Sequence, residues 1–125
     1  MGAKTTNDPI KIISMVQSDF FQTNNEIPWQ DAGPGAQRQV YGFDAHLMLV
    51  KVQFEKGAVG ALHTHPHSQS SYVASGSFEV IIGDQKKVIA AGDGFYVPPH
   101  VLHGCTCLEA GMLVDAFSPS REDFI

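Results

Sequence analysis

The sequence is poor in positive charge and cysteine, and it lacks any long hydrophobic run. Eight Lys and Arg residues against thirteen Asp and Glu give a formal net charge of −5. Nucleic acids are bound by basic surfaces, so this charge argues against a nucleic-acid partner. No apolar segment approaches the roughly 20 residues of a membrane-spanning helix or resembles a secretion signal behind residues 1–4. We therefore expect no membrane partner.

The only two cysteines, Cys105 and Cys107, are separated by one residue. Strand residues two apart rarely meet the geometry of a disulfide, so we expect two free thiols. Free thiols and the missing secretion signal together predict a cytoplasmic protein.

A chain of 125 residues has the length of one domain with a single hydrophobic core. Residues 1–26 are weakly patterned and are treated as an N-terminal extension, in which only residues 10–16 could form an edge strand or a dimer arm. Residues 27–125 are expected to form the folded domain. Twelve Gly and seven Pro predict many tight turns in it.

Short runs with a period of two residues predict an all-β domain. Met48, Val50, Val52 and Phe54 alternate with Lys51, Gln53 and Glu55, as in a half-buried strand. We expect further strands at 70–74, 78–82, 88–90, 95–97 and 112–118, separated by turn residues. No stretch within 27–118 has helical periodicity, and the strand spacing is typical of a sandwich or barrel.

Three histidines and a glutamine have spacings that a metal ion can use. The first segment reads G-x5-H-x-H-x3-Q-x6-G from Gly57 to Gly76, with His63, His65 and Gln69 as proposed ligands; a second segment ends at His103. Residues two apart on a strand point to the same face, which would bring the first two rings together. The absence of paired thiolates favours an open site for one divalent ion, Ni, Zn, Fe or Mn, over a structural zinc.

The other histidines have simpler explanations. His46 and His100 are interpreted as core or surface residues, and His67 as a rim residue, with a ligand or pocket role as the alternative. Cys105 and Cys107 are expected to be small inward-facing hydrophobes.

At these motifs the chain resembles the cupin superfamily. Gln69 stands where the first cupin motif has glutamate, and Gly92, Pro98 and His103 match the second motif, in which His100 and Cys107 replace its glycine and asparagine. The resemblance implies a small jelly-roll β-barrel, usually dimeric, with the metal inside. Loss of the glutamate disfavours dioxygenase-type redox chemistry.

A narrower resemblance is to the pectin-degradation cupins of the KdgF family. It covers about residues 27–125 and rests on the HxHPHxQ segment at 63–69, the VPP segment at 97–99, a Trp followed by G-x-G-x2-R at 29–38, and the REDF ending at 121–124. It implies conversion of 4,5-unsaturated monouronates, derived from pectin or alginate, to linear keto forms. It also implies that Asp115, Phe117 and Arg121 line the active site.

Strand alternation allows two orientations of this tail. Leu113, Asp115 and Phe117 share one face. If that face is interior, Asp115 is a buried carboxylate, which is seldom retained without a partner or a function. If it is exterior, Asp115 is solvated and Phe117 lies at a dimer contact.

We therefore predict a metal-dependent isomerase with Asp115 as proton carrier, Arg121 as clamp of the substrate carboxylate and Phe117 packed on the sugar. One alternative is a cupin dioxygenase acting on a small organic substrate, which would consume oxygen. Another is a sugar- or effector-binding cupin without turnover, although such modules usually accompany a DNA-binding helix-turn-helix for which this chain has no room. A homodimer is expected from the resemblance.

Overall fold

The computed structural model describes residues 3–4 and 16–125, and nearly all of its regular structure is β. The strands are β1 (Ala3–Lys4), β2 (Gln17–Ser18), β3 (Gln30–Asp31), β4 (Ala36–Phe43), β5 (Met48–Phe54), β6 (Val59–His63), β7 (Ser68–Ile82), β8 (Gln85–Ala90), β9 (Gly94–Val97) and β10 (His103–Ser118). Two short 3-10 helices, η1 (Asn24–Glu26) and η2 (Glu122–Phe124), complete the elements. The prediction of an all-β chain is therefore confirmed.

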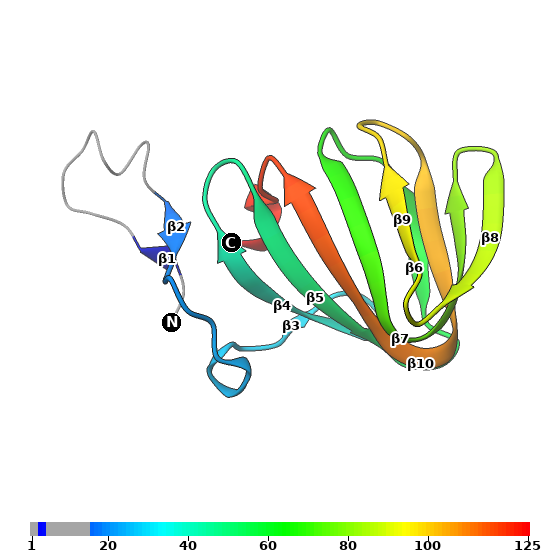
Figure 1. Cartoon of the computed structure of the whole chain (residues 1–125), viewed down its shortest axis with the longest axis horizontal. Coiled ribbons are helices and arrows are strands. Elements are labelled where there is room, and N and C mark those ends of the chain that lie inside the picture. The colour runs from blue at the N-terminus through cyan, green and yellow to red at the C-terminus, as the bar shows by residue number, and fades with distance from the viewer. Residues whose placement is uncertain (1–2, 5–15) are drawn as a thin grey trace.

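Two long antiparallel strands, β7 and β10, form the middle of the large sheet. The order is β3-β4-β5-β10-β7-β8, with β6 also paired to β10 and β9 also paired to β7. The sheet curves so that β4 and β5 stand on one side of an interior and β8 on the other (Figure 1). Strands β1 and β2 form a separate pair.

The two long strands bend where their backbones approach too closely for any residue but glycine. Gly76 has a φ of 79°, a left-handed conformation that few other residues adopt. A Cβ at Gly76 would lie 2.5 Å from the backbone oxygen of Glu109, and one at Gly111 would meet the backbone oxygen of Ser75. The register between β7 and β10 shifts in the same region. These glycines allow one pair of strands to serve both sides of the barrel.

Two clusters of buried apolar side chains fill the interior. The larger contains Ala36, Phe54, Ala58, Val73, Phe78, Val80, Ile89, Cys107 and Leu113. Within it the rings of Phe54 and Phe78 meet edge to face, with centroids 5.2 Å apart, an arrangement that adds to the gain from burial alone. The smaller contains Phe43, Met48, Val50 and Phe117. The apolar clusters surround a more polar region on the inner faces of β7 and β10.

The strand predictions were correct in type and incomplete in extent. Strands β5, β8 and β9 lie at the expected segments. The segments 70–74 and 78–82 are parts of the single strand β7, and 112–118 is the second half of β10. Of the strand expected at 10–16, residues 10–15 lie outside the described residues, and Val16 packs against the smaller apolar cluster. No helix among the described residues is long and apolar enough to span a membrane.

Candidate metal centre

Three histidine rings converge where β6 ends and β10 begins. His63 and His103 are register partners on these two strands, and their ring centroids lie 4.3 Å apart. The ring of His65 lies 4.7 Å from that of His103. One nitrogen from each ring can be chosen so that all three lie within 4.8 Å of one another. The three rings therefore form a group able to bind a metal ion.

The structure differs from the sequence-based explanation of how His65 reaches this group. Strand β6 ends at His63, so His65 lies in the turn before β7 rather than on a strand. Strand alternation thus does not bring the two rings together. Pro66 follows directly and lacks a backbone N–H, which accounts for the interruption of the ladder.

The hydrogen bonds of the rings leave the same nitrogen available in all three. The Nδ1 atoms of His63, His65 and His103 lie 2.8, 3.1 and 2.9 Å from the carbonyl oxygens of Ala61, His67 and Val101. A carbonyl only accepts, so each Nδ1 carries the proton and each Nε2 retains its lone pair. Backbone carbonyls that accept from the other ring nitrogen typically orient metal-binding histidines.

Gln69 is oriented by a chain of buried hydrogen bonds. The Oγ of Ser71 donates its proton to the Oδ1 of Asp115 at 2.6 Å. The same Ser71 Oγ accepts from the Nε2 of Gln69 at 3.0 Å. The amide oxygen of Gln69 must then face His65, whose Nε2 lies 2.9 Å away. This links the histidine group to Asp115 through two polar side chains.

The donor set fits a divalent cation. The Nε2 of His103 is buried and has no hydrogen-bond partner in the described part of the chain. The lone pair of His65 Nε2 faces the lone pairs of the Gln69 oxygen, a repulsive arrangement that a cation between them would relieve. Burial lowers the pKa of both His65 and His103, which keeps these rings neutral, as metal ligands must be.

Asp115 lies on the inner face of β10 and is 8% exposed. The interior orientation of the tail is therefore correct, since Leu113 and Phe117 on the same face are also buried. Burial raises the pKa of the Asp115 carboxyl from its ordinary 3.8 to about 6, although the Ser71 hydroxyl and the Arg121 charge oppose the rise. A carboxyl in this range can both accept and donate a proton near neutral pH.

His63, His103, Gln69 and Asp115 adjoin a cavity of about 190 Å³. Its lining includes His63, Gln69, His103, Asp115, Phe117, Arg121 and Phe124. Phe117 packs against His65, with ring centroids 5.7 Å apart, and the guanidinium carbon of Arg121 lies 5.1 Å from the Phe117 ring centre. The cavity thus combines a candidate metal centre, a carboxyl group, a cation and aromatic walls.

The remaining histidines and the cysteines differ in how close they lie to the proposed ligands. The ring of His67 lies 5.3 Å from that of His65, and Cys105 lines the same cavity. His46 and His100 are exposed, as expected. His67 is half-buried, with its ring 6.4 Å from that of Phe117, and lies at the edge of the group. Cys107 belongs to the larger apolar cluster and Cys105 packs against it, and both are free thiols.

Ser71 is a site residue that the sequence interpretation did not identify. It joins Gln69 to Asp115 and is 4% exposed. Its position two residues after Gln69 on a strand places both side chains on one face, which was the available signal. A serine is too common in strands for that signal to stand out.

Comparison with known proteins identifies the family of this chain. The family model of the cupin domain matches residues 50–115. The pectin degradation protein KdgF of Dickeya dadantii is 42% identical over 104 residues, which are 82% of this chain and 94% of that protein. The chain belongs to the KdgF family of cupins. The predicted cupin fold is thereby confirmed.

Two solved structures resemble this cupin over most of its length. An RmlC-like cupin from Shewanella frigidimarina is 50% identical, with a TM-score of 0.85, over 87% of this chain and 98% of that one. The structure of KdgF from a Halomonas species is 42% identical, with a TM-score of 0.81, over 84% of this chain and 99% of that one. The barrel is thus shared along nearly the whole of each relative.

Proposed function

We propose that this cupin is a metal-dependent isomerase that opens the ring of 4,5-unsaturated monouronates and converts them to linear keto forms. The relative from Dickeya dadantii, which matches 82% of the chain, is named a pectin degradation protein, and the lyases that degrade pectin and alginate release these sugars. The single observation that carries the proposal is the buried carboxyl of Asp115, linked through Ser71 and Gln69 to three converging histidines.

The reaction is an isomerisation and needs no oxidant or reductant. The substrate is a cyclic hemiacetal whose ring oxygen is part of an enol ether, and it bears a carboxylate. Removing the anomeric hydroxyl proton forms the aldehyde carbonyl and breaks the bond from the anomeric carbon to the ring oxygen. The ring oxygen becomes the oxygen of an enolate. The removed proton then adds to the double-bond carbon that is not bonded to this oxygen, which gives the ketone and retains every atom of the substrate.

Asp115 is the group in the cavity suited to move this proton. Its raised pKa of about 6 leaves it mostly ionised at pH 7 and still able to take up and return a proton. Ser71 fixes one carboxyl oxygen through the 2.6 Å bond and leaves the other for the substrate. We assign Asp115 the transfer from the hydroxyl group to the carbon.

The other side chains would hold the substrate and the metal. His63, His65, Gln69 and His103 are the proposed ligands, and a divalent ion on these uncharged donors would supply Lewis-acid polarisation of the substrate oxygens. Phe117 would pack on the sugar and exclude water. Arg121 would supply positive charge that attracts the substrate carboxylate into a chain of net charge −5.

The cavity size agrees with a single sugar unit. At about 190 Å³ the cavity is smaller than the roughly 300–1,000 Å³ of sites for drug-sized ligands. It would accommodate a monouronate better than a polymer.

An oxidative function would require reaction with O₂ at a centre whose fourth donor is an amide rather than a carboxylate, which favours the non-redox reaction.

The proposal is tested by a time course with unsaturated monouronate made by a lyase. The absorbance of the conjugated double bond should fall faster with metal-loaded protein than without protein, and a chelator should abolish the difference. An oxygen electrode in the same reaction should record no uptake. Equal rates with and without protein would contradict the isomerase proposal, and oxygen uptake would favour a dioxygenase.

We also propose that this cupin acts in the cytoplasm as a homodimer. Its two thiols are free, as a reducing compartment maintains them. The ion could be Ni, Zn, Fe or Mn, because imidazole and amide donors accommodate each of them.

A further inference from the structure

Both arginines of the chain line the same cavity. Arg38 and Arg121 are the only arginines among the 125 residues, and both border the cavity that His63, His103 and Asp115 line. Both guanidinium groups also stack on one ring, with their central carbons 3.8 Å and 4.3 Å from the centre of Phe124. In a chain with an excess of acidic residues, this concentration of arginine marks a site for an anion.

Arg121 already has a carboxylate partner. Its Nε and Nη2 donate to the two carboxylate oxygens of Asp123 at 3.0 and 2.9 Å. This is the two-point pairing by which a guanidinium recognises a carboxylate. Two of the nitrogens of Arg121 are therefore occupied by Asp123, and fewer N–H donors remain for a substrate.

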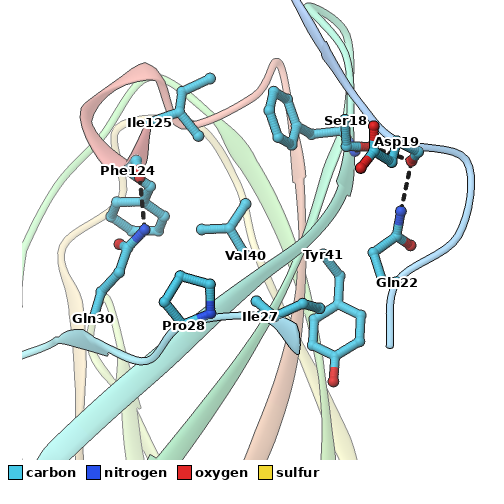
Figure 2. A pocket seen from close by; sticks show the side chains of 11 residues that line it. Ser18, Asp19, Gln22, Ile27, Pro28, Gln30, Val40, Tyr41, Phe124 and Ile125 are labelled. Atoms are coloured by element: carbon cyan, nitrogen blue, oxygen red, sulfur yellow. Dashed lines mark hydrogen bonds between the residues drawn. The ribbon is translucent and has the colours of Figure 1, made fainter. Parts of the chain in front are cut away.

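Arg38 is held in place but has no carboxylate partner. Its Nε donates to the Oε1 of Gln30 at 3.1 Å. The Nε2 of Gln30 in turn donates to the carbonyl oxygen of Phe124 at 3.0 Å. Both residues also line a second cavity, in which Figure 2 draws this contact. Within residues 16–125 neither terminal nitrogen of Arg38 has a hydrogen-bond or ion-pair partner. These nitrogens form an oriented pair of donors with unused capacity.

The strand places Arg38 on the inner face of the barrel. Ala36 and Val40, two residues before and after it on β4, contact the larger and the smaller apolar cluster respectively. Arg38 is register partner of Val52 on β5, which packs against the same clusters. A cation on this face is removed from part of its water and has no carboxylate within ion-pair distance among the described residues. Burial and the Arg121 charge lower the pKa of Arg38, although the Asp123 and Asp31 charges oppose the shift. An anionic ligand would relieve that unfavourable situation.

We infer that Arg38 is the principal binding partner of the substrate carboxylate, through its two terminal nitrogens. The inference rests on the proposed function, and it gives Arg121 the lesser role of adding charge while paired to Asp123. Gln30 and the Phe124 ring position the Arg38 guanidinium. The substrate class follows from this arrangement: a monosaccharide with a planar carboxylate, rather than a neutral sugar.

The test compares an unsaturated monouronate with its methyl ester, which lacks the negative charge. Loss of hydrogen bonds to a charged group should raise the KM for the acid about 10- to 100-fold in Arg38→Gln, with little change for the ester. Arg38→Lys, which keeps the charge but lacks the paired donors, should show an intermediate rise. Lys86→Gln removes an exposed cation on β8 and should change neither KM.

Two results would overturn the inference. One is a KM for the acid within twofold of wild type in Arg38→Gln or, if that variant does not fold, in Arg38→Lys. The other is an equal rise for acid and ester. Titration with galacturonate and its methyl ester measures the same preference without turnover. If wild type binds galacturonate but converts no unsaturated sugar, the proposed function fails, while dependence of that binding on Arg38 still decides the inference.

Discussion

Replacing the buried carboxyl of Asp115 by an amide should make the protein more stable and nearly inactive. In the folded chain, burial raises the pKa of Asp115 from 3.8 to about 6. That rise means that ionising this carboxyl costs about 3 kcal/mol more in the folded state than in the unfolded state. Asp115→Asn removes this penalty and keeps an oxygen that can accept from Ser71.

The pH dependence of this effect has a definite sign. Between pH 3.8 and about 6 the folded state binds more protons at Asp115 than the unfolded state, so stability falls as the pH rises. The penalty is absent below pH 3.8 and fully present above about 6. Thermal melts of chelator-treated protein at pH 7.5 should therefore show Asp115→Asn stabilised by about 1–3 kcal/mol, or about 3–12 °C. The difference should disappear near pH 4.

Activity should move in the opposite direction. Loss of one acid–base group lowers turnover by roughly 10²–10⁴, whereas metal content should remain that of wild type. The Asp115→Glu variant serves as a control that keeps the carboxyl group. The reasoning would be refuted if Asp115→Asn melted at or below the wild-type temperature at pH 7.5, or if its turnover were unchanged.

Three further substitutions test the ligands, their support and the fold. His103→Ala should lower metal affinity by more than the roughly 10- to 100-fold that loss of a supporting group causes, measured by elemental analysis after dialysis; retained metal would remove His103 from the ligands. Ser71→Ala leaves buried polar groups unpaired and should lower the free energy of unfolding by about 1–3 kcal/mol, whereas exposed Ser70→Ala should not; equal denaturation midpoints would contradict this. Gly76→Ala places a Cβ 2.5 Å from a backbone oxygen and should destabilise more than Gly92→Ala, which shares the positive φ but meets nothing within 4 Å; matched melting temperatures would show that the close approach is not limiting.

Local alternation predicted β5, β8, β9 and parts of β7 and β10, but not β4. Met48 to Phe54 forms β5 with Met48, Val50 and Phe54 buried and Val52 half-buried, because a period of two requires only that one face be covered. The length of β7 and β10 could not be predicted in this way. Their bend occurs where glycines allow two backbones to approach, and such an approach depends on residues more than thirty positions apart.

The candidate site was predicted from spacing in part. The spacing identified His63 and His103 as ligands, and the fold places them opposite one another on paired strands. For His65 the spacing was right while the reason was wrong, since a turn rather than a strand positions the ring. Ser71 and the pairing of Arg121 with Asp123 depend on side-chain geometry that a linear pattern does not contain.

The claim that a cation on these donors enables the conversion is tested most directly by adding metal back to chelator-stripped protein during turnover of unsaturated monouronate. The rate of double-bond loss should start near that of the protein-free reaction, rise with each increment of metal, and level off at one ion per chain, since the described residues bring together one such histidine group. A stripped protein as active as the loaded one would contradict the claim, as would a rate unaffected by added metal.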